Sequence, residues 1–345
     1  MNRRRLLAII LLTIAIILLI GTPVWLFTPL GANVAGFGQV DLNGPPLTPI
    51  AFRTVPRTVP QAVLTPLGEP SQFSASEALL MDADTGNILY EKNGEVPVPM
   101  ASTTKIMTAL IAIQSGKLDQ IITVGQDAYD EVHNNGGSGA QLVVGNKIKL
   151  QDLLYGLMLP SGDDAAVVIA DGVAGSTQNF VSIMNVEAQK LHLYSTHFAN
   201  VDGLQPFDSQ GNPIFGQHYT TPYDLARLAH YAMNIPLFAQ IVQTKEHDLP
   251  ASGTHNSYPW TNINTLLFTY NGMLGIKTGW TPQAGGCLVF AAKRNGHTLI
   301  GVVLHSTKPA STSDQQQIQD EQLRMTDART LLDWGFALPM QVPQM

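Results

Sequence analysis

The hydrophobic and polar residues divide the chain into regions of different character. Residues 6–27 carry no charge and are mostly apolar. Residues 28–74 hold many Pro, Gly and Thr and few charges, and their prolines are incompatible with a continuous helix. From residue 75 to residue 340, apolar residues recur with the spacings of strands and helices. The pattern predicts an extended linker over 28–74 and one folded domain over 75–340.

Both ends of this domain have the pattern of strands. Residues 78–83 and 88–91 are strand-like and flank Asp84-Thr85-Gly86-Asn87, a sequence typical of a turn. Residues 286–293 and 298–305 are strand-like as well, and a hairpin turn is expected between them.

The middle of the domain has the pattern of helices. Helices are predicted for residues 103–114, 152–159, 163–174 and 221–234, followed by a closing helix over 315–334. Thr221 suits the N-cap of its helix, and Pro222 suits the first turn. Strands at both ends with helices between them predict an α+β fold, in which the chain ends form an antiparallel sheet and a helical cluster is inserted.

The N-terminus has the pattern of a membrane signal. Arg3, Arg4 and Arg5 stand directly before the apolar region, and leading arginines favour a cytoplasmic N-terminus. A spanning helix needs about 20 apolar residues. We therefore expect residues 1–5 to be a cytoplasmic segment and residues 6–27 a transmembrane signal anchor, with the domain outside the cell membrane. The alternative is a cleaved signal peptide, whose apolar core of roughly 7–15 residues also fits, and the domain would then be secreted.

Composition narrows the classes of function. The 345 residues are 45% hydrophobic, enough for a sizeable core, and the net charge is −7. An acidic chain without a basic stripe argues against a nucleic-acid partner. Cys287 is the single cysteine, so no intramolecular disulfide and no Cys/His zinc motif is expected, and Cys287 is interpreted as a buried apolar side chain. No metal and no cofactor is predicted.

A serine and a lysine with catalytic spacing open the helical region. A serine hydroxyl needs an adjacent base to act as a nucleophile, and Ser102 and Lys105, three residues apart, share one face of a helix. Burial or a nearby cation would lower the pKa of such a lysine and let it act as a base. Taken alone, this motif favours the ordinary interpretation, an N-cap serine and a solvated lysine.

Two further motifs make the first more specific. Ser161-Gly162-Asp163 and Lys277-Thr278-Gly279 follow it, and each of the three patterns occurs once in the chain. By themselves they are typical of a helix start and of a strand ending in a turn. Together, in this order, they are the set found in class A β-lactamases and penicillin-binding proteins.

The flanking residues resemble one branch of that group, the low-molecular-mass penicillin-binding proteins, which are serine-type D-alanyl-D-alanine carboxypeptidases. The similar segments are residues 78–86, 99–108, 197–204, 218–226 and 275–281. The resemblance covers about residues 75 to 336 and implies a β-lactamase/penicillin-binding-protein-like fold.

The resemblance also implies roles. Ser102 would attack the terminal peptide bond of peptidoglycan stem peptides ending in D-Ala-D-Ala and form an acyl-enzyme, with Lys105 as its base. Ser161 would relay a proton to the leaving amine. Substrate binding would fall to Asp163, Lys277, Thr278, Gly279 and Trp280. Within that set, Lys277 and Thr278 would hold the terminal carboxylate, and the backbone N–H groups of Ser102 and Trp280 would form the oxyanion hole. β-Lactams would inhibit by acylating Ser102.

One position departs from the family pattern, and alternatives stay open. The family usually carries Asn where this chain has Asp163, and an ionised Asp offers only acceptors. A catalytically silent peptidoglycan-binding protein is therefore the alternative from another class of function. Endopeptidase or transpeptidase activity is a further alternative. A β-lactamase is disfavoured, because the setting of Glu187 does not resemble the loop that carries its deacylating glutamate. His218, which precedes a helix, is interpreted as structural.

Overall fold

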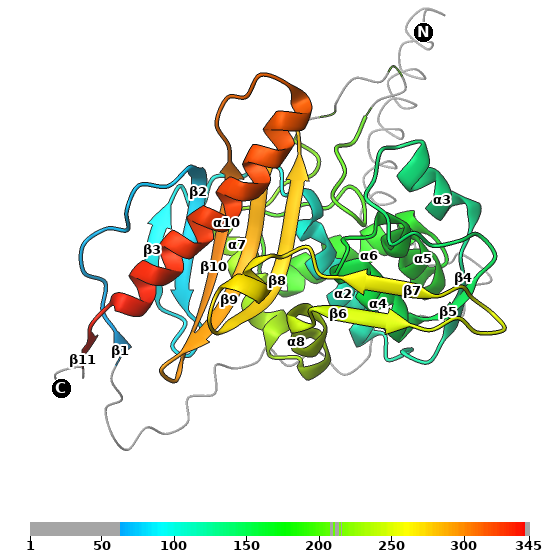
Figure 1. Ribbon diagram of the computed structural model, residues 1–345, viewed down its shortest axis with the longest axis horizontal. Helices are drawn as coiled ribbons and strands as arrows, with labels where there is room; N and C mark the ends of the chain where they lie inside the picture. The colour runs from blue at the N-terminus through cyan, green and yellow to red at the C-terminus, as the bar shows by residue number, and fades with distance from the viewer. Residues whose placement is uncertain (1–62, 208–209, 211–213, 215, 342–345) are drawn as a thin grey trace, which may run out of the picture. The chain divides into compact units, whose positions relative to one another are not determined.

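The computed structural model describes residues 63–207, 210, 214 and 216–341. Its centre is a five-stranded antiparallel sheet with the strand order β3-β2-β10-β9-β8 (Figure 1). The strands are β2 (Ala75–Asp82), β3 (Ile88–Lys92), β8 (Met273–Thr281), β9 (Gly285–Arg294) and β10 (His297–Ser306). The sheet joins the start of the domain to its end, so the predicted α+β architecture with strands from both chain ends is confirmed.

The hairpin between β9 and β10 shows why its turn could be predicted. Arg294 pairs with His297, which leaves Asn295 and Gly296 as the two turn residues. Both have positive φ, 51° and 83°, as a turn that follows the right-handed twist of the strands requires. Asn and Gly are the residues that adopt this conformation most readily, so the local sequence determines the register of the hairpin.

Side chains alternate between the two faces of the sheet. On β2, Ala78 and Leu80 pack in one apolar cluster with Leu331 and Leu332 of α10 (Ser313–Ala337). The neighbouring Leu79 and Met81 pack in the other cluster, with the inserted helices. Figure 1 shows α10 crossing one face of the sheet and α7 (Pro222–Met233) behind it. Both faces are therefore covered, which explains the nearly continuous burial of β2, β9 and β10.

The inserted helices lie where the apolar spacing predicted them. Residues 101–104 form the 3₁₀ turn η1, and the predicted helices correspond to α2 (Lys105–Gln114), α4 (Leu150–Met158), α5 (Asp163–Ala174) and α7. The side chain of Thr221 caps α7 by accepting a hydrogen bond from Asp224 N, and Pro222 occupies its first turn, as predicted. The other elements were not predicted: α3 (Gln126–His133), α6 (Thr177–Lys190), α8 (Pro236–Gln243), α9 (Leu266–Thr269), β4 (Ile121–Thr123), β5 (Lys147–Lys149), β6 (Glu246–Leu249) and β7 (Tyr258–Thr261).

The folded part begins before residue 75, so the predicted linker is too long at its C-terminal end. β1 (Val63–Leu64) pairs with β11 (Met340–Gln341), close to the other end of the chain. The Asp327 carboxylate on α10 then accepts hydrogen bonds from the backbone N–H groups of Ser74 and Ala75, which leads the chain into β2. These pairings join residues more than 250 positions apart, and a local pattern contains no sign of them.

The predicted anchor over residues 6–27 and the cytoplasmic segment over residues 1–5 lie outside the described residues. None of the helices that the structure describes is long and apolar enough to span a bilayer.

Candidate active site

Ser102 lies in η1, immediately before α2 and beside β8. The preceding Ala101 has φ of +46°, and the turn presents the Ser102 side chain half-buried, not fully covered. Lys105, the first residue of α2, lies one turn further on, as the spacing of the first motif predicted.

Lys105 is completely buried, and its Nζ has three oxygen partners. They are Ser102 Oγ at 2.9 Å, the backbone oxygen of Asp202 at 2.9 Å and the carboxylate of Asp163. The first two motifs therefore meet at this one nitrogen, because α2 and α5 pack side by side and present their first residues to the same place.

The third motif reaches the second one in the same way. Lys277 on β8 is 1% exposed, and its Nζ donates to Ser161 Oγ at 2.9 Å and to the backbone oxygen of Thr278 at 2.8 Å. Ser161 is buried and has φ of +67°, an unusual conformation for a residue with a side chain. Burial lowers the pKa of Lys277 well below its usual range, and the charges of Lys105 and Arg324 act in the same direction.

The remaining predicted residues follow Lys277 along β8. Thr278 is buried, and a Cβ added to Gly279 would lie 3.0 Å from Ser102 N, so the strand passes directly against the turn that carries Ser102. Trp280 is half-buried, and its Nε1 donates to Asp320 on α10 at 3.1 Å. All eight residues singled out from the sequence thus lie in one connected region of the fold.

Arg324 is a site residue that the motifs did not reveal. It is 4% exposed on α10, and its Nη1 donates to the backbone oxygen of Gly279 at 2.7 Å. Through this bond, α10 fixes the backbone of the third motif at Gly279. The signal was its spacing: Arg324 lies in register with Ala328 and Leu331 on the buried face of an otherwise polar helix.

His218 contacts the turn that carries Ser102 from the other side. Its Nδ1 accepts from the backbone N–H of Ala199 at 3.0 Å, so the neutral ring carries its proton on Nε2, which lies 2.7 Å from Thr104 Oγ1. Thr104 Oγ1 in turn donates to the backbone oxygen of Ala101 at 2.8 Å. The structural interpretation of His218 is therefore confirmed, and its role is to position the peptide unit directly before Ser102.

The burial of His218 makes the stability of the fold depend on pH. Burial lowers the pKa of His218 from 6.5 to about 3, with His197 and Lys105 adding to the effect. Between these two pKa values the unfolded chain binds a proton that the folded chain does not. The free energy of unfolding should therefore fall as the pH drops below 6.5, by up to about 1.4 kcal/mol per pH unit.

We expect His218→Asn to make this acid slope shallower, because Asn keeps an acceptor for Ala199 N–H but does not titrate. Urea unfolding of the full-length chain between pH 5 and 7.5 measures the slope. His192→Asn, at an exposed histidine that is not among the groups acting on His218, is the matched control and should keep the parent slope. Equal slopes in all three proteins would contradict the assignment.

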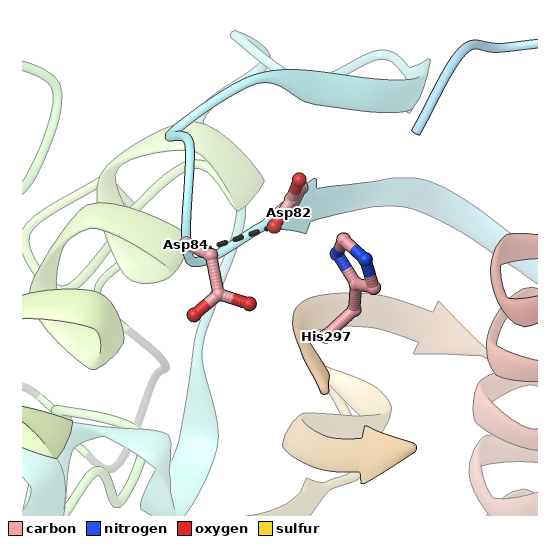
Figure 2. Close-up of side chains that lie close together, drawn as sticks. All are labelled: Asp82, Asp84 and His297. Atoms are coloured by element: carbon pink, nitrogen blue, oxygen red, sulfur yellow. Dashed lines mark hydrogen bonds between the residues drawn. The ribbon is translucent and has the colours of Figure 1, made fainter. Parts of the chain in front are cut away.

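Two other groups of reactive side chains have structural explanations. Asp82, Asp84 and His297 have ligand atoms within 4.8 Å of one another, a set that could hold a metal ion. Figure 2 shows these three side chains close together. The Asp82 carboxylate, however, accepts from Asp84 N and Thr85 Oγ1 and so closes the turn between β2 and β3. Cys287 is buried in β9, and burial raises the pKa of its thiol to about 12, in keeping with an apolar role.

Comparison with known proteins agrees with this geometry. A family model described as D-alanyl-D-alanine carboxypeptidase matches residues 64–308. A D-alanyl-D-alanine carboxypeptidase of Streptomyces sp. strain K15 is 39% identical over 271 residues, 75% of this chain and 86% of that protein. The carboxypeptidase DacF of Bacillus subtilis strain 168 is 33% identical over 244 residues, 70% of this chain and 60% of DacF. The crystal structure of the Streptomyces K15 DD-transpeptidase superposes with a TM-score of 0.69 at 38% identity, covering 79% of this chain and all of that one.

Proposed function

The chain belongs to the D-alanyl-D-alanine carboxypeptidase family of serine hydrolases, and we propose that Ser102 is the nucleophile with which it removes the terminal D-alanine of peptidoglycan stem peptides. The observation that supports these roles best is that the three motifs contact one another through buried lysine side chains. Lys105 contacts Ser102 Oγ, and Lys277 contacts Ser161 Oγ, each at 2.9 Å. A serine beside a lysine that is fully removed from water is the arrangement that nucleophilic catalysis requires.

The chemistry follows from these contacts. Lys105 takes the Ser102 proton while Ser102 Oγ bonds to the carbonyl carbon of the penultimate D-alanine. The tetrahedral intermediate places its oxygen near the backbone N–H groups of Ser102 and Trp280, which the close approach of β8 to Ser102 supports. Ser161 passes a proton to the leaving D-alanine, and water then releases the shortened peptide. A β-lactam carbonyl meets the same nucleophile, so penicillin acylates Ser102.

Lys277 explains why the enzyme would cleave at the C-terminal residue of its substrate. Burial disfavours the ammonium form of Lys277 and lowers its pKa, and the charges of Lys105 and Arg324 act in the same direction. A substrate carboxylate brings the opposite charge, so it restores the ammonium and pairs with it. The site therefore recognises a free C-terminus, which is what distinguishes a carboxypeptidase from an endopeptidase.

We expect the parent to cleave a peptide ending in D-Ala-D-Ala about 10- to 100-fold faster, in kcat/KM, than the same peptide with a C-terminal amide. Lys277→Met keeps the length of the side chain and removes its charge, and this ratio should fall toward one. Released D-alanine and D-alaninamide measure the two rates. Lys293→Met, at an exposed lysine on the neighbouring β9, should keep the parent ratio. An unchanged preference in Lys277→Met would remove Lys277 from carboxylate recognition.

We also propose that residues 6–27 anchor the chain in the cell membrane with the domain on the extracytoplasmic side, where peptidoglycan lies. Support comes from Arg3-Arg4-Arg5 directly before a charge-free apolar stretch. Release of the protein into the soluble fraction after deletion of residues 6–27, but not before, is the measurement that checks the anchor.

A further inference from the structure

The loop over residues 134–140 lies against the second motif of the site, although none of the three motifs includes it. Its sequence is Asn-Asn-Gly-Gly-Ser-Gly-Ala. Near its start, the backbone N–H of Gly137 donates to the oxygen of Glu131 on α3 at 3.1 Å. At its end, the backbone N–H of Ala140 donates to the buried Asp164 carboxylate on α5 at 2.8 Å. The loop is therefore tied to two helices.

Ser138 in this loop contacts both polar residues of the second motif. Its backbone N–H donates to the Asp163 carboxylate at 2.6 Å, and its backbone oxygen accepts from Asp163 N–H at 2.7 Å. Gly137 permits this approach, because a Cβ there would lie 2.6 Å from the Asp163 carboxylate. The Ser138 hydroxyl donates to the backbone oxygen of Ser161 at 2.6 Å and lies 3.4 Å from Asp163 Oδ2. The backbone thus holds the loop against Asp163, while the main partner of the side chain is Ser161.

Ser161 has a backbone conformation that needs support from its surroundings. Its φ of +67° lies in the left-handed region, which residues with a side chain adopt only where neighbouring contacts enforce it. The Ser138 hydroxyl holds the backbone oxygen of Ser161, and Lys277 Nζ contacts its Oγ at 2.9 Å. The direction of Ser161 Oγ therefore depends on one contact from β8 and one from the loop.

We propose that Ser138 is a positioning residue for the reaction: by holding the backbone oxygen of Ser161, it keeps Ser161 Oγ where a proton can pass to the leaving amine. The inference rests on the proposed function, in which Ser161 is the proton relay. Ser138 acts through Ser161, so its effect depends on how much the leaving group needs a proton.

The leaving group decides whether the relay matters. When Ser102 Oγ bonds to the carbonyl carbon of a peptide, the C–N bond breaks as the nitrogen takes a proton, which comes from Lys105 through Ser161. In a thioester the C–S bond breaks instead, and sulfur leaves with the electron pair as a thiolate. A thiolate is a stable leaving group because the pKa of a thiol is only about 8.5, and the proton on Lys105 is later lost to water. A displaced Ser161 therefore slows cleavage of the peptide and spares that of the thioester.

The test compares two substrates of the full-length chain: a peptide ending in D-Ala-D-Ala, and the same peptide with sulfur in place of the terminal amide nitrogen. Ser138→Ala should lower kcat/KM about tenfold for the peptide and less than about threefold for the thioester. Ser138→Thr keeps the hydroxyl and should restore the parent ratio. An equal loss for both substrates, or a parent-like rate on the peptide, overturns the proposal.

The fold should tolerate these variants. Ser138 is exposed, so its truncation leaves no buried cavity, and Ser138→Ala should unfold in urea close to the parent midpoint. Ser182 on α6 is the matched control, because it is also exposed and its hydroxyl also donates to a backbone oxygen, that of Gln178 at 3.0 Å. Ser182→Ala should keep both parent rates.

Ser161→Ala separates failure of this inference from failure of the proposed function. It removes the relay itself, so it should lose the peptide selectively and at least as strongly as Ser138→Ala. A selective loss in Ser161→Ala with none in Ser138→Ala overturns the role of Ser138 alone. An equal loss of both substrates in Ser161→Ala overturns the relay assigned to Ser161. A folded parent that cleaves neither substrate overturns the proposed function, and this inference falls with it.

Discussion

Ser102→Ala is expected to abolish the covalent adduct that the parent chain forms with penicillin, and to lower release of D-alanine at least about 10³-fold. The hydroxyl that Lys105 contacts at 2.9 Å is the only atom lost. The half-buried site and the proposed oxyanion donors remain, so we expect the substrate still to bind, but no acyl-enzyme to form. Intact-mass analysis of the full-length chain after incubation with penicillin measures the adduct directly.

A serine elsewhere on the same helix is the control for this result. Ser115 follows the C-terminal end of α2, about 15 Å along the helix from Lys105, and its hydroxyl donates to the Ala112 oxygen. Ser115→Ala should form the adduct like the parent. An adduct that persists in Ser102→Ala would place the nucleophile elsewhere. A folded parent that forms none would favour the catalytically silent peptidoglycan-binding protein.

Gly203→Ala is expected to slow acylation at least about 100-fold and to lower the free energy of unfolding by about 3 kcal/mol or more. Gly203 has φ of +101°, which L side chains rarely adopt, and a Cβ there would lie 1.9 Å from the Ala101 oxygen and 2.8 Å from Ser102 N. The Ala101 oxygen is hydrogen-bonded to Thr104 Oγ1, which is in turn hydrogen-bonded to His218. These bonds keep the oxygen from moving away from an added Cβ. The added methyl must therefore displace the turn that carries Ser102 or the loop that carries Asp202.

Gly116→Ala separates the clash from the backbone strain. Gly116 also has positive φ, +69°, but a Cβ there would have no atom within 4 Å. This variant should lose only about 1 kcal/mol and acylate at the parent rate. Urea unfolding and the rate of penicillin acylation measure both effects. Parent-like acylation of Gly203→Ala would show that the turn before Ser102 tolerates movement and is not held as tightly as these contacts indicate.

Local chemistry explains how much of the fold and the site could be predicted. The turn residues Asn295 and Gly296 and the cap residue Thr221 act on their immediate neighbours, so their effect is visible in the sequence. The spacing of Ser102 and Lys105 is likewise a property of one helical turn. The order of the three motifs identified the groups that would meet, through resemblance to a family. It did not supply the contacts between them.

The elements that were not predicted have weak local patterns or distant partners. α6 is amphipathic only in part and has four buried residues in fourteen, so its apolar spacing is indistinct. β1 pairs with β11 across almost the whole domain. Arg324 reaches Gly279, and His218 reaches Thr104, through contacts 45 and 114 residues apart in the chain. Such contacts depend on how whole elements pack, and a single window of sequence does not contain them.

Asp163 illustrates the difference between what the sequence determined and what only the tertiary structure determined. The sequence alone determined that a carboxylate stands in the second motif, that a lysine follows the candidate nucleophile, and that both lie at the starts of helices. Only the packing of α2 against α5 brought the two side chains into contact and removed both from water. Because electrostatic interactions depend on distance and on burial, the sequence determined the residue types, while the tertiary structure determined their contact and their removal from water.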